Sequence, residues 1–406
     1  MVAEILKRLH RPKLFGPTML ADPYPHYTRL RRIDPVHWAE GPGHWVLTRY
    51  ADIVSVLRSS HASAERIEIN QRQVPAEFQE VFTARKDAMI NADPPRHTRL
   101  RLLVNKAFTP GAVAALAPFI QRLVDDLIDT VQPRDRMDVI RDLAYPLPAT
   151  VIAEMLGVPH ADRDRFKQWS NDIAAVIGNF PGGLSEGVLR RGVHGMRELR
   201  AYFRGIVVQR RIEPRDDLIS ALVKAQQEGD RLNEAELLAN AVLLLNAGHE
   251  TTTNLIGNGA LALLRHPDQL RRLREDPALI PTAVEELLRY DSPVQFTSRV
   301  LKADLTLGGK QLRAGQTVLL LLGAANRDPA QFPDPDRLDV GRADNKHLSF
   351  GLGSHYCLGA PLARLEGRIV FETLFRRLPG LRLAHPAPVY RQNFNLRGLE
   401  ALEVAF

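Results

Sequence analysis

Residues 350–359 read FGLGSHYCLG and contain the single cysteine of this chain, Cys357. Three glycines within these ten residues predict a backbone that turns tightly or lies against a flat partner. The Ala/Leu-rich segment after Cys357, with Pro361 in its first turn, predicts a helix. Cys357 is therefore expected at a loop-to-helix junction, where the helix dipole favours a thiolate over a thiol.

Three interpretations of Cys357 are open on this evidence. A lone cysteine in an intracellular protein is most often a small, inert, buried side chain. A nucleophile would need a base, and His355 is two residues away. The glycines favour a third interpretation, an axial thiolate ligand to a haem iron. Gly351 and Gly353 would let the loop fold beneath the macrocycle, and Gly359 would let the helix start approach it closely.

Composition indicates a large globular protein. The chain has 406 residues, 45% of them hydrophobic, and shows no linker, repeat or low-complexity tract, so we expect a single domain over residues 1–406. One cysteine fits a reducing cytoplasm. The first residues, MVAEILKRLHRPK, lack the apolar core of a signal peptide. The longest apolar runs, such as 318–322, are far shorter than the ~18 residues of a membrane span, so no membrane anchor is expected.

The charge balance is mildly basic, with 54 Lys and Arg against 47 Asp and Glu, a net charge of +7. No basic run, zinc-finger spacing or aromatic RNA-binding motif accompanies this excess, so nucleic acid is not expected as a partner. A small acidic protein partner or an anionic cofactor fits it better.

Periodicity along the chain predicts more helix than strand. The longest helix is expected over 234–265, where Asn233 and Glu236 resemble a capping box. Residues 61–91 show no clean period and are expected to form a long, irregular connection. The fold class predicted is mainly α with small β-sheets (α+β). The other elements expected are strands at 44–50, 299–307 and 316–322, helices at 51–57, 112–130, 148–155 and 280–290, and two helices meeting around the loop at 180–183.

The middle of the predicted long helix reads Ala247-Gly248-His249-Glu250-Thr251-Thr252. A carboxylate in an apolar central helix is costly unless it has a partner or a task. Thr251 can bond back to the carbonyl of Ala247 and open the helix locally. These features suggest a groove that holds a diatomic ligand and passes protons to it. An ordinary helix with a packing glycine and a threonine run is an equal alternative.

Two further charge patterns are weaker signals. Glu286 and Arg289 place opposite charges at i and i+3 on one helix face. The prolines at 94 and 95 predict a helix start, after which His97 and Arg101 share a face. Such a pair could clamp an anionic group, although a surface His/Arg pair is the commoner explanation.

The order of these four signals resembles the cytochrome P450 family, the haem-thiolate monooxygenases. Residues 350–359 match the pattern Phe-Gly-x-Gly-x-His-x-Cys-x-Gly at every fixed position, and Glu286 with Arg289 matches Glu-x-x-Arg. The resemblance extends over essentially the whole chain. It implies the P450 fold, in which a long central helix lies over a haem and the cysteine loop lies beneath it.

The resemblance assigns roles to individual residues around a haem b (iron protoporphyrin IX). Cys357 matches the axial thiolate, the metal ligand, and Phe350 the aromatic residue that packs beside it. The remaining cofactor-binding positions implied are the propionate partners His97, Arg101, Arg299 and His355, together with Gly351, Gly359 and Ala247. Glu286 and Arg289 are implied as a structural charge network, with Arg337 as its third member.

Glu250 and Thr251 match the acid–alcohol pair that delivers protons to dioxygen, one atom of which is inserted into a lipophilic small molecule by hydroxylation or epoxidation. Terpenoids, steroids, macrolides and fatty acids all fit this class. By analogy the substrate is contacted by the irregular stretch before Asp93, by the loop region around Phe180, and by Leu244, Ala247, His249, residues 293–297 with Val294, Gln295 and Phe296, Phe394 and Asn395.

Electrons are expected from a separate ferredoxin or flavodoxin and its reductase, docking to a monomer on the face of the cysteine loop. Arg99, Lys106, Arg364 and Arg368 could supply positive charge there, although solvated helix charges explain them equally well. A haem-thiolate gas sensor or ligand-binding protein is the alternative function. It would leave Glu250 and Thr251 without a task, and no DNA-binding or signalling module is visible in the sequence.

Overall fold

The computed structural model describes residues 16–406 except 73, 180–183, 228–231 and 386–387. The amino-terminal segment and the loop at 180–183, both interpreted above, lie outside the described residues. The helices that form the core or border the site are α3 Tyr24–Ile33, α4 Tyr50–Arg58, α5 Ile67–Gln71, α6 Glu80–Thr83, α7 Arg96–Asn105, α8 Pro110–Ala115, α9 Ala117–Val131, α10 Pro146–Met155, α11 Arg163–Asn179, α12 Glu186–Ile212, α13 Leu218–Gln227, α14 Glu234–Arg265, α16 Ile280–Tyr290 and α18 Ala360–Arg377. Shorter or peripheral helices are α2 Pro17–Ala21, α15 Pro267–Glu275 and α17 Leu322–Ala325.

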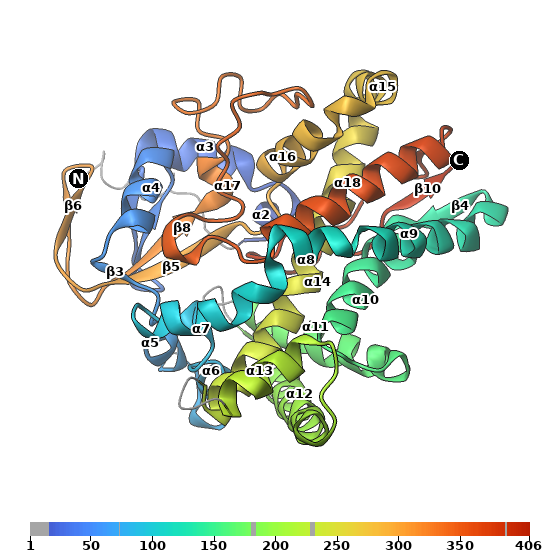
Figure 1. The fold of residues 1–406 in the computed structure, drawn as a ribbon. Coiled ribbons are helices and arrows are strands. Elements are labelled where there is room, and N and C mark those ends of the chain that lie inside the picture. The colour runs from blue at the N-terminus through green and yellow to red at the C-terminus, as the bar shows by residue number, and fades with distance from the viewer. Residues whose placement is uncertain (1–15, 73, 180–183, 228–231, 386–387) are drawn as a thin grey trace.

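Helix α14 has the predicted bounds and passes through the centre of the molecule (Figure 1). The capping box predicted from Asn233 and Glu236 is present: the Asn233 side chain accepts from the Glu236 N–H at 2.8 Å, and Glu236 Oε2 accepts from the Asn233 N–H at 3.1 Å. Gly248 has a packing role, because a Cβ there would lie 2.8 Å from Ile152 of α10. The glycine therefore lets two helices approach and does not by itself open a groove.

Strands form one five-stranded sheet in the order β1-β2-β8-β5-β3 and two smaller sheets. In the large sheet β2 and β8 run parallel, whereas β8 pairs antiparallel with β5, so that Arg299 lies opposite Val318. This sheet lies with α3, α4 and α17 on one side of the molecule, and α9 and α10 lie on the opposite side of α14 (Figure 1). The strands are β1 Val36–Ala39, β2 His44–Leu47, β3 Ala62–Ser63, β4 Arg136–Asp138, β5 Phe296–Leu301, β6 Leu305–Leu307, β7 Lys310–Leu312, β8 Thr317–Leu321, β9 Arg382–Leu383 and β10 Glu403–Ala405.

The α+β class predicted from the sequence, mainly α with small sheets in the P450 arrangement, is confirmed. Several boundaries were wrong. The helix expected over 112–130 is divided into α8 and α9, because Pro118 occupies the first turn of a new helix. The irregular connection at 61–91 contains the short helices α5 and α6, and the strand expected at 299–307 is divided between β5 and β6.

Within the described residues no single helix is both long and apolar enough to cross a membrane. One pair bent by 64°, Arg96–Ala115 with Ala117–Arg134, meets the length and composition criteria only when its two parts are taken together.

Candidate active site

The loop before α18 is closed on itself at the cysteine. The Cys357 N–H donates to the Phe350 carbonyl at 2.8 Å, which folds residues 350–357 into a compact turn. Gly351 and Gly353 have φ angles of 69° and 75°, in the left-handed region that favours glycine. A Cβ on Gly353 would also lie 3.0 Å from the Leu57 carbonyl oxygen. The glycines are therefore required by the backbone of this loop.

The Cys357 thiol is accessible to solvent although protein surrounds it. Burial raises the pKa of this thiol, and the N–H groups of Gly359 and Ala360, with Arg101 and Arg364, offset only part of that effect. The sequence suggested that the start of the helix favours the thiolate form of Cys357. In the structure the helix start alone is not sufficient for this. A cationic partner such as a metal ion would supply the missing stabilisation. A Cβ on Gly359 would point into open space, so this position leaves room for a bulky group beside the sulfur.

Four predicted propionate partners, two histidines and two arginines, lie together beside this loop. The rings of His97 and His355 lie 4.1 Å apart between centroids, and Arg101 Nη1 donates to the Ser354 carbonyl at 3.2 Å. Within the described residues, Arg299 donates only to Thr297 Oγ1 and to the Ser298 carbonyl.

The nearest carboxylate does not neutralise this cluster. Asp93 is already bound by Lys302 Nζ at 2.6 Å and by the Ser63 hydroxyl. Burial, reinforced by the neighbouring Arg299 and His97, lowers the pKa of His355 to about 3. His97 Nδ1 is buried and has no hydrogen-bond partner in the part of the chain that the structure describes. A cluster rich in donors and short of anions, next to an accessible thiol, fits the two propionates of a haem.

A cavity of about 420 Å³ lies between α14 and the sheet, and Ala247 and Thr251 form part of its wall. The Thr251 hydroxyl donates to the Ala247 carbonyl at 2.9 Å, as predicted, so its oxygen remains available as an acceptor toward the cavity. Glu250 Oε2 accepts from Arg391 Nη1 at 3.0 Å, which holds the carboxylate beside the chain's C-terminal segment. Glu250 is not among the described residues that line the cavity.

Of the expected substrate contacts, Ala247, Val294, Phe296 and Asn395 line this cavity. The α14 residues that line the cavity are Leu243, Asn246, Ala247 and Thr251, spaced three or four residues apart along one face. The expectation for Leu244 was wrong in phase by one residue, since its side chain is buried in the core.

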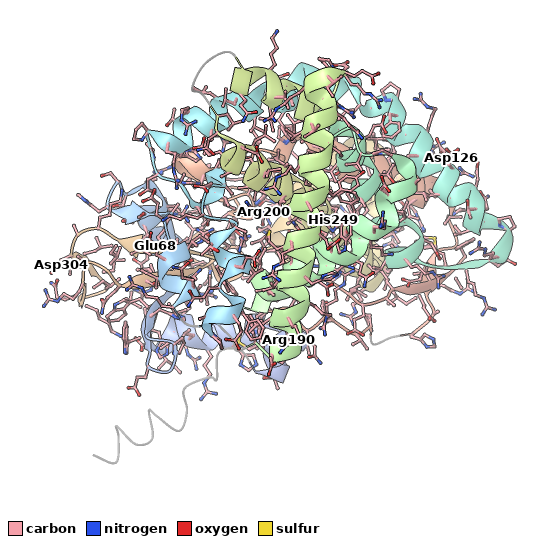
Figure 2. All side chains as sticks on the ribbon, turned by 90° about the horizontal axis from the view of Figure 1, so that it is seen from below. Glu68, Asp126, Arg190, Arg200, His249 and Asp304 are labelled. Carbon is pink, nitrogen blue, oxygen red and sulfur yellow. The ribbon has the colours of Figure 1, made fainter. Side chains whose placement is uncertain are left out.

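His249 was also expected at the substrate and lies elsewhere. Its buried ring borders a separate recess beside Tyr145, with Nδ1 at 2.9 Å from the Leu245 carbonyl. Figure 2 labels His249 among the side chains. The Gln295 side chain makes internal hydrogen bonds: its Oε1 accepts from the Tyr27 hydroxyl at 3.0 Å and its Nε2 donates to the Ser292 carbonyl. Phe394 packs with the core beneath the amino-terminal helices. None of these three side chains is among the described residues that line the cavity.

The charge network of Glu286 and Arg289 is fully buried, with two hydrogen bonds of 2.8 Å between the side chains. The third side chain is Arg342, whose Nε donates to Glu286 Oε2 at 3.1 Å. Arg337 was expected there, but its side chain is exposed and only its carbonyl accepts from Arg289. The network ties α16 to the segment before the cysteine loop and has a structural role.

Four residues of this region were missed in the sequence. Arg66, Arg85 and Arg391 gave no signal, because isolated arginines in an arginine-rich chain cannot be distinguished from solvated ones. Glu366 could have been found, since it is a carboxylate on the buried face of the predicted final helix. It is 1% exposed, and burial raises its pKa to about 8, an effect that the neighbouring Thr252 hydroxyl offsets only in part.

Comparisons with known proteins agree with this geometry. The sequence matches the family model of cytochrome P450 over residues 40–379. It is 41% identical to the biotin biosynthesis cytochrome P450 of Bacillus subtilis over 95% of this chain and 97% of that protein. It is 42% identical to the vitamin D(3) 25-hydroxylase of Pseudonocardia autotrophica over 96% of this chain and 95% of that protein.

The fold matches the crystal structure of P450BioI in complex with an acyl carrier protein that carries hexadec-9Z-enoic acid. The TM-score is 0.90 at 40% identity, over 96% of this chain and 100% of that one. The family uses haem as its cofactor, and its characterised members among these relatives are monooxygenases. The thiol, the group of His97, Arg101, Arg299 and His355, and the cavity beside α14 agree with these matches. The chain belongs to the cytochrome P450 family of haem-thiolate monooxygenases.

Proposed function

We propose that this P450 inserts one atom of dioxygen into a lipophilic small molecule, by hydroxylation or epoxidation. The observation that carries the proposal is the cavity of about 420 Å³, whose wall joins Thr251 to mostly apolar side chains. Apolar walls with a few polar groups are typical of sites for lipophilic ligands. The relatives that hydroxylate vitamin D(3) or hold a long acyl chain support the same class.

The haem, when bound, supplies the oxygen chemistry, and the residues of this chain supply its setting. Cys357 would be the thiolate ligand of the iron, and His97, Arg101, Arg299, His355 and Arg66 would bind the propionates. The Thr251 oxygen would accept a hydrogen bond from a protonated group in the cavity, because its own proton is donated to the Ala247 carbonyl, and Glu250 would receive protons from beyond α14. Because Arg391 binds the Glu250 carboxylate, proton transfer requires that this side chain turn, or that water bridge it to Thr251.

We further propose that electrons come from a separate ferredoxin or flavodoxin, that the enzyme is a cytoplasmic monomer, and that residues 1–406 form one P450 domain. The largest buried cluster runs from Ile67 to Val404, and two smaller clusters each join residues before 60 to residues after 295, which supports the last point. Two of the four basic residues expected at the docking face are already paired, Arg99 with Glu236 and Arg364 with Glu285. Arg368 is exposed, and the side chain of Lys106 lies outside the described ones.

The test begins with the reduced, carbon monoxide-bound spectrum of the purified protein. A red-shifted thiolate band is expected for the wild type and should be lost in Cys357→Ser. A lipophilic compound library is then screened for shifts in iron spin state, and binders are assayed for oxygenated product with a ferredoxin, its reductase and dioxygen. Absence of the band in the wild type overturns the haem-thiolate assignment, and binders without any oxygenated product overturn the monooxygenase proposal.

A further inference from the structure

Two arginines line the same cavity as Thr251. Arg66 is the residue before α5, and Arg85 is in the turn that follows α6. The backbone of Arg85 is fixed from three sides: its N–H donates to the Phe82 carbonyl at 2.9 Å, its carbonyl accepts from Asn91 Nδ2 at 2.9 Å, and the adjacent Ala84 carbonyl accepts from Arg200 Nη1 at 3.0 Å. Arg200 comes from α12, the long helix that crosses this face of the molecule (Figure 2).

Neither arginine has a carboxylate partner within the part of the chain that the structure describes. Arg66 Nη1 donates only to the Ser298 carbonyl, at 3.3 Å, and the Arg85 side chain makes no hydrogen bond or ion pair there. The acidic residues nearest in sequence are paired with other cations, Glu65 and Asp87 with Arg96, and Glu68 with Lys86.

Both guanidinium groups remain cationic at neutral pH. Burial lowers the pKa of Arg85 to about 10, and burial together with the charges of Arg299 and Arg85 lowers that of Arg66 to about 9. A partly buried cation without an anion is unfavourable, so the cavity wall is more stable with an anionic group against it.

The haem propionates account for only one of the two arginines. Arg66 shares an acceptor with Arg299, because the Nη1 atoms of both donate to the Ser298 carbonyl, so Arg66 belongs with His97, Arg101, Arg299 and His355. Arg85 neighbours Arg66, but within the described residues its side chain makes no hydrogen bond or ion pair with any of that group. Arg85 is therefore the cation of the cavity wall that no contact assigns to the cofactor.

We propose that the substrate is a lipophilic carboxylic acid whose carboxylate pairs with Arg85 while its apolar body fills the rest of the cavity. This assignment rests on the proposed monooxygenase function and narrows its substrate class. The body would lie against apolar side chains of the same wall, among them Phe82, Ile90, Ile177, Leu243, Val294 and Leu396. The pairing would fix the end of the ligand that carries the charge and so limit which carbon reaches Thr251.

The experiment compares octanoic, dodecanoic and hexadecanoic acids with their methyl esters, by spin-state titration of the haem-loaded protein at pH 7.5. At least one acid should bind the wild type more tightly than its ester. Arg85→Gln should weaken binding of that acid by about 30-fold or more and leave the ester unchanged, because the carboxylate loses its only cation. Arg85→Lys, which keeps the charge, should recover most of the affinity. Arg72→Gln, an exposed arginine at the end of α5, is the matched control and should bind acid and ester like the wild type.

Three results overturn the carboxylate assignment while the monooxygenase function stands. They are no preference of the wild type for any acid over its ester, equal weakening of acid and ester in Arg85→Gln, and loss of haem from Arg85→Gln, which would make Arg85 a propionate partner. Haem content is therefore measured for every variant. Failure of the proposed function is seen separately, as absence of the thiolate band in the reduced carbon monoxide complex of the wild type.

Discussion

Thr251 is placed so that one hydroxyl serves two partners, the backbone of its own helix and the cavity. Its donor proton is used by the Ala247 carbonyl, so the oxygen can accept a hydrogen bond from a protonated group in the cavity. Removal of this acceptor should not prevent electron uptake, but should prevent controlled proton delivery.

Thr251→Ala is therefore expected to keep consuming electrons while product per electron falls about ten-fold or more, with hydrogen peroxide released instead. Product, peroxide and reductant are measured together in the reconstituted system. Thr251→Ser keeps the hydroxyl and should keep most of the yield. Equal product per electron in the alanine variant would remove Thr251 from proton delivery.

Glu366 gives a pH-dependent prediction at the same scale. Its pKa is about 8 in the folded protein, against about 4.3 for an unfolded glutamate. Between these values the folded state holds a proton that the unfolded state has released, so this carboxyl destabilises the fold increasingly as pH rises, by up to ~1.4 kcal/mol per pH unit. The loss is complete once the pH passes the folded pKa.

Glu366→Gln, which stays neutral, should remove this slope and be more stable than the wild type at pH 8. Urea unfolding of the haem-loaded protein at pH 5.5 and pH 8 measures the effect. Glu372→Gln, exposed on the same helix, is the control and should follow the wild type. Parallel pH dependence in wild type and Glu366→Gln would contradict the assignment of a buried, neutral carboxyl.

At the scale of elements, features that lie within a short stretch of sequence could be predicted. Features that depend on contacts between residues far apart in the sequence could not. The bounds of α14 could be predicted because Asn233 and Glu236 cap it within four residues of sequence. The face of α14 that lines the cavity could not be predicted, since both Leu243 and Leu244 are apolar and hydrophobic periodicity does not distinguish a cavity wall from a packed core. The sequence also did not decide whether Arg337 or Arg342 pairs with Glu286. The choice depends on the path of the turn between these two arginines, which could not be predicted. The cysteine loop was predictable because its glycines and ligand are contiguous in sequence.

The two adjacent leucines provide a matched test of this phase. Leu243→Ala enlarges the cavity wall and should change the spin-state dissociation constant of a bound ligand several-fold. Leu244→Ala leaves a hole in the core and should instead lower the free energy of unfolding by about 2–5 kcal/mol without changing ligand affinity. Ligand titration and urea unfolding of both variants distinguish these outcomes. An exchange of the two effects would place Leu244 at the cavity.

At the scale of the whole molecule, the two sides of α14 have separate tasks. The cavity lies on the Thr251 side, and Glu250 with Arg391 lies away from it. The cysteine loop contacts α7, since Arg101 of that helix donates to the Ser354 carbonyl. Leu102 on α7 is 63% exposed, and Arg368 on α18 is exposed as well. An apolar side chain among basic ones is typical of the surface to which a small acidic protein docks.

The contribution of Arg368 is the prediction that belongs to this scale. Arg368→Glu should weaken binding of an acidic ferredoxin and slow the first electron transfer by about three- to ten-fold at low salt, because it reverses an exposed charge near the cysteine loop. The difference should shrink as salt rises toward 1 M, where the Debye length falls to ~3 Å. Arg376→Glu, at the far end of the same helix, changes net charge equally and should have a much smaller effect. Stopped-flow reduction across a salt series measures both variants, and equal slowing by the two would show that overall charge, not this surface, controls the encounter.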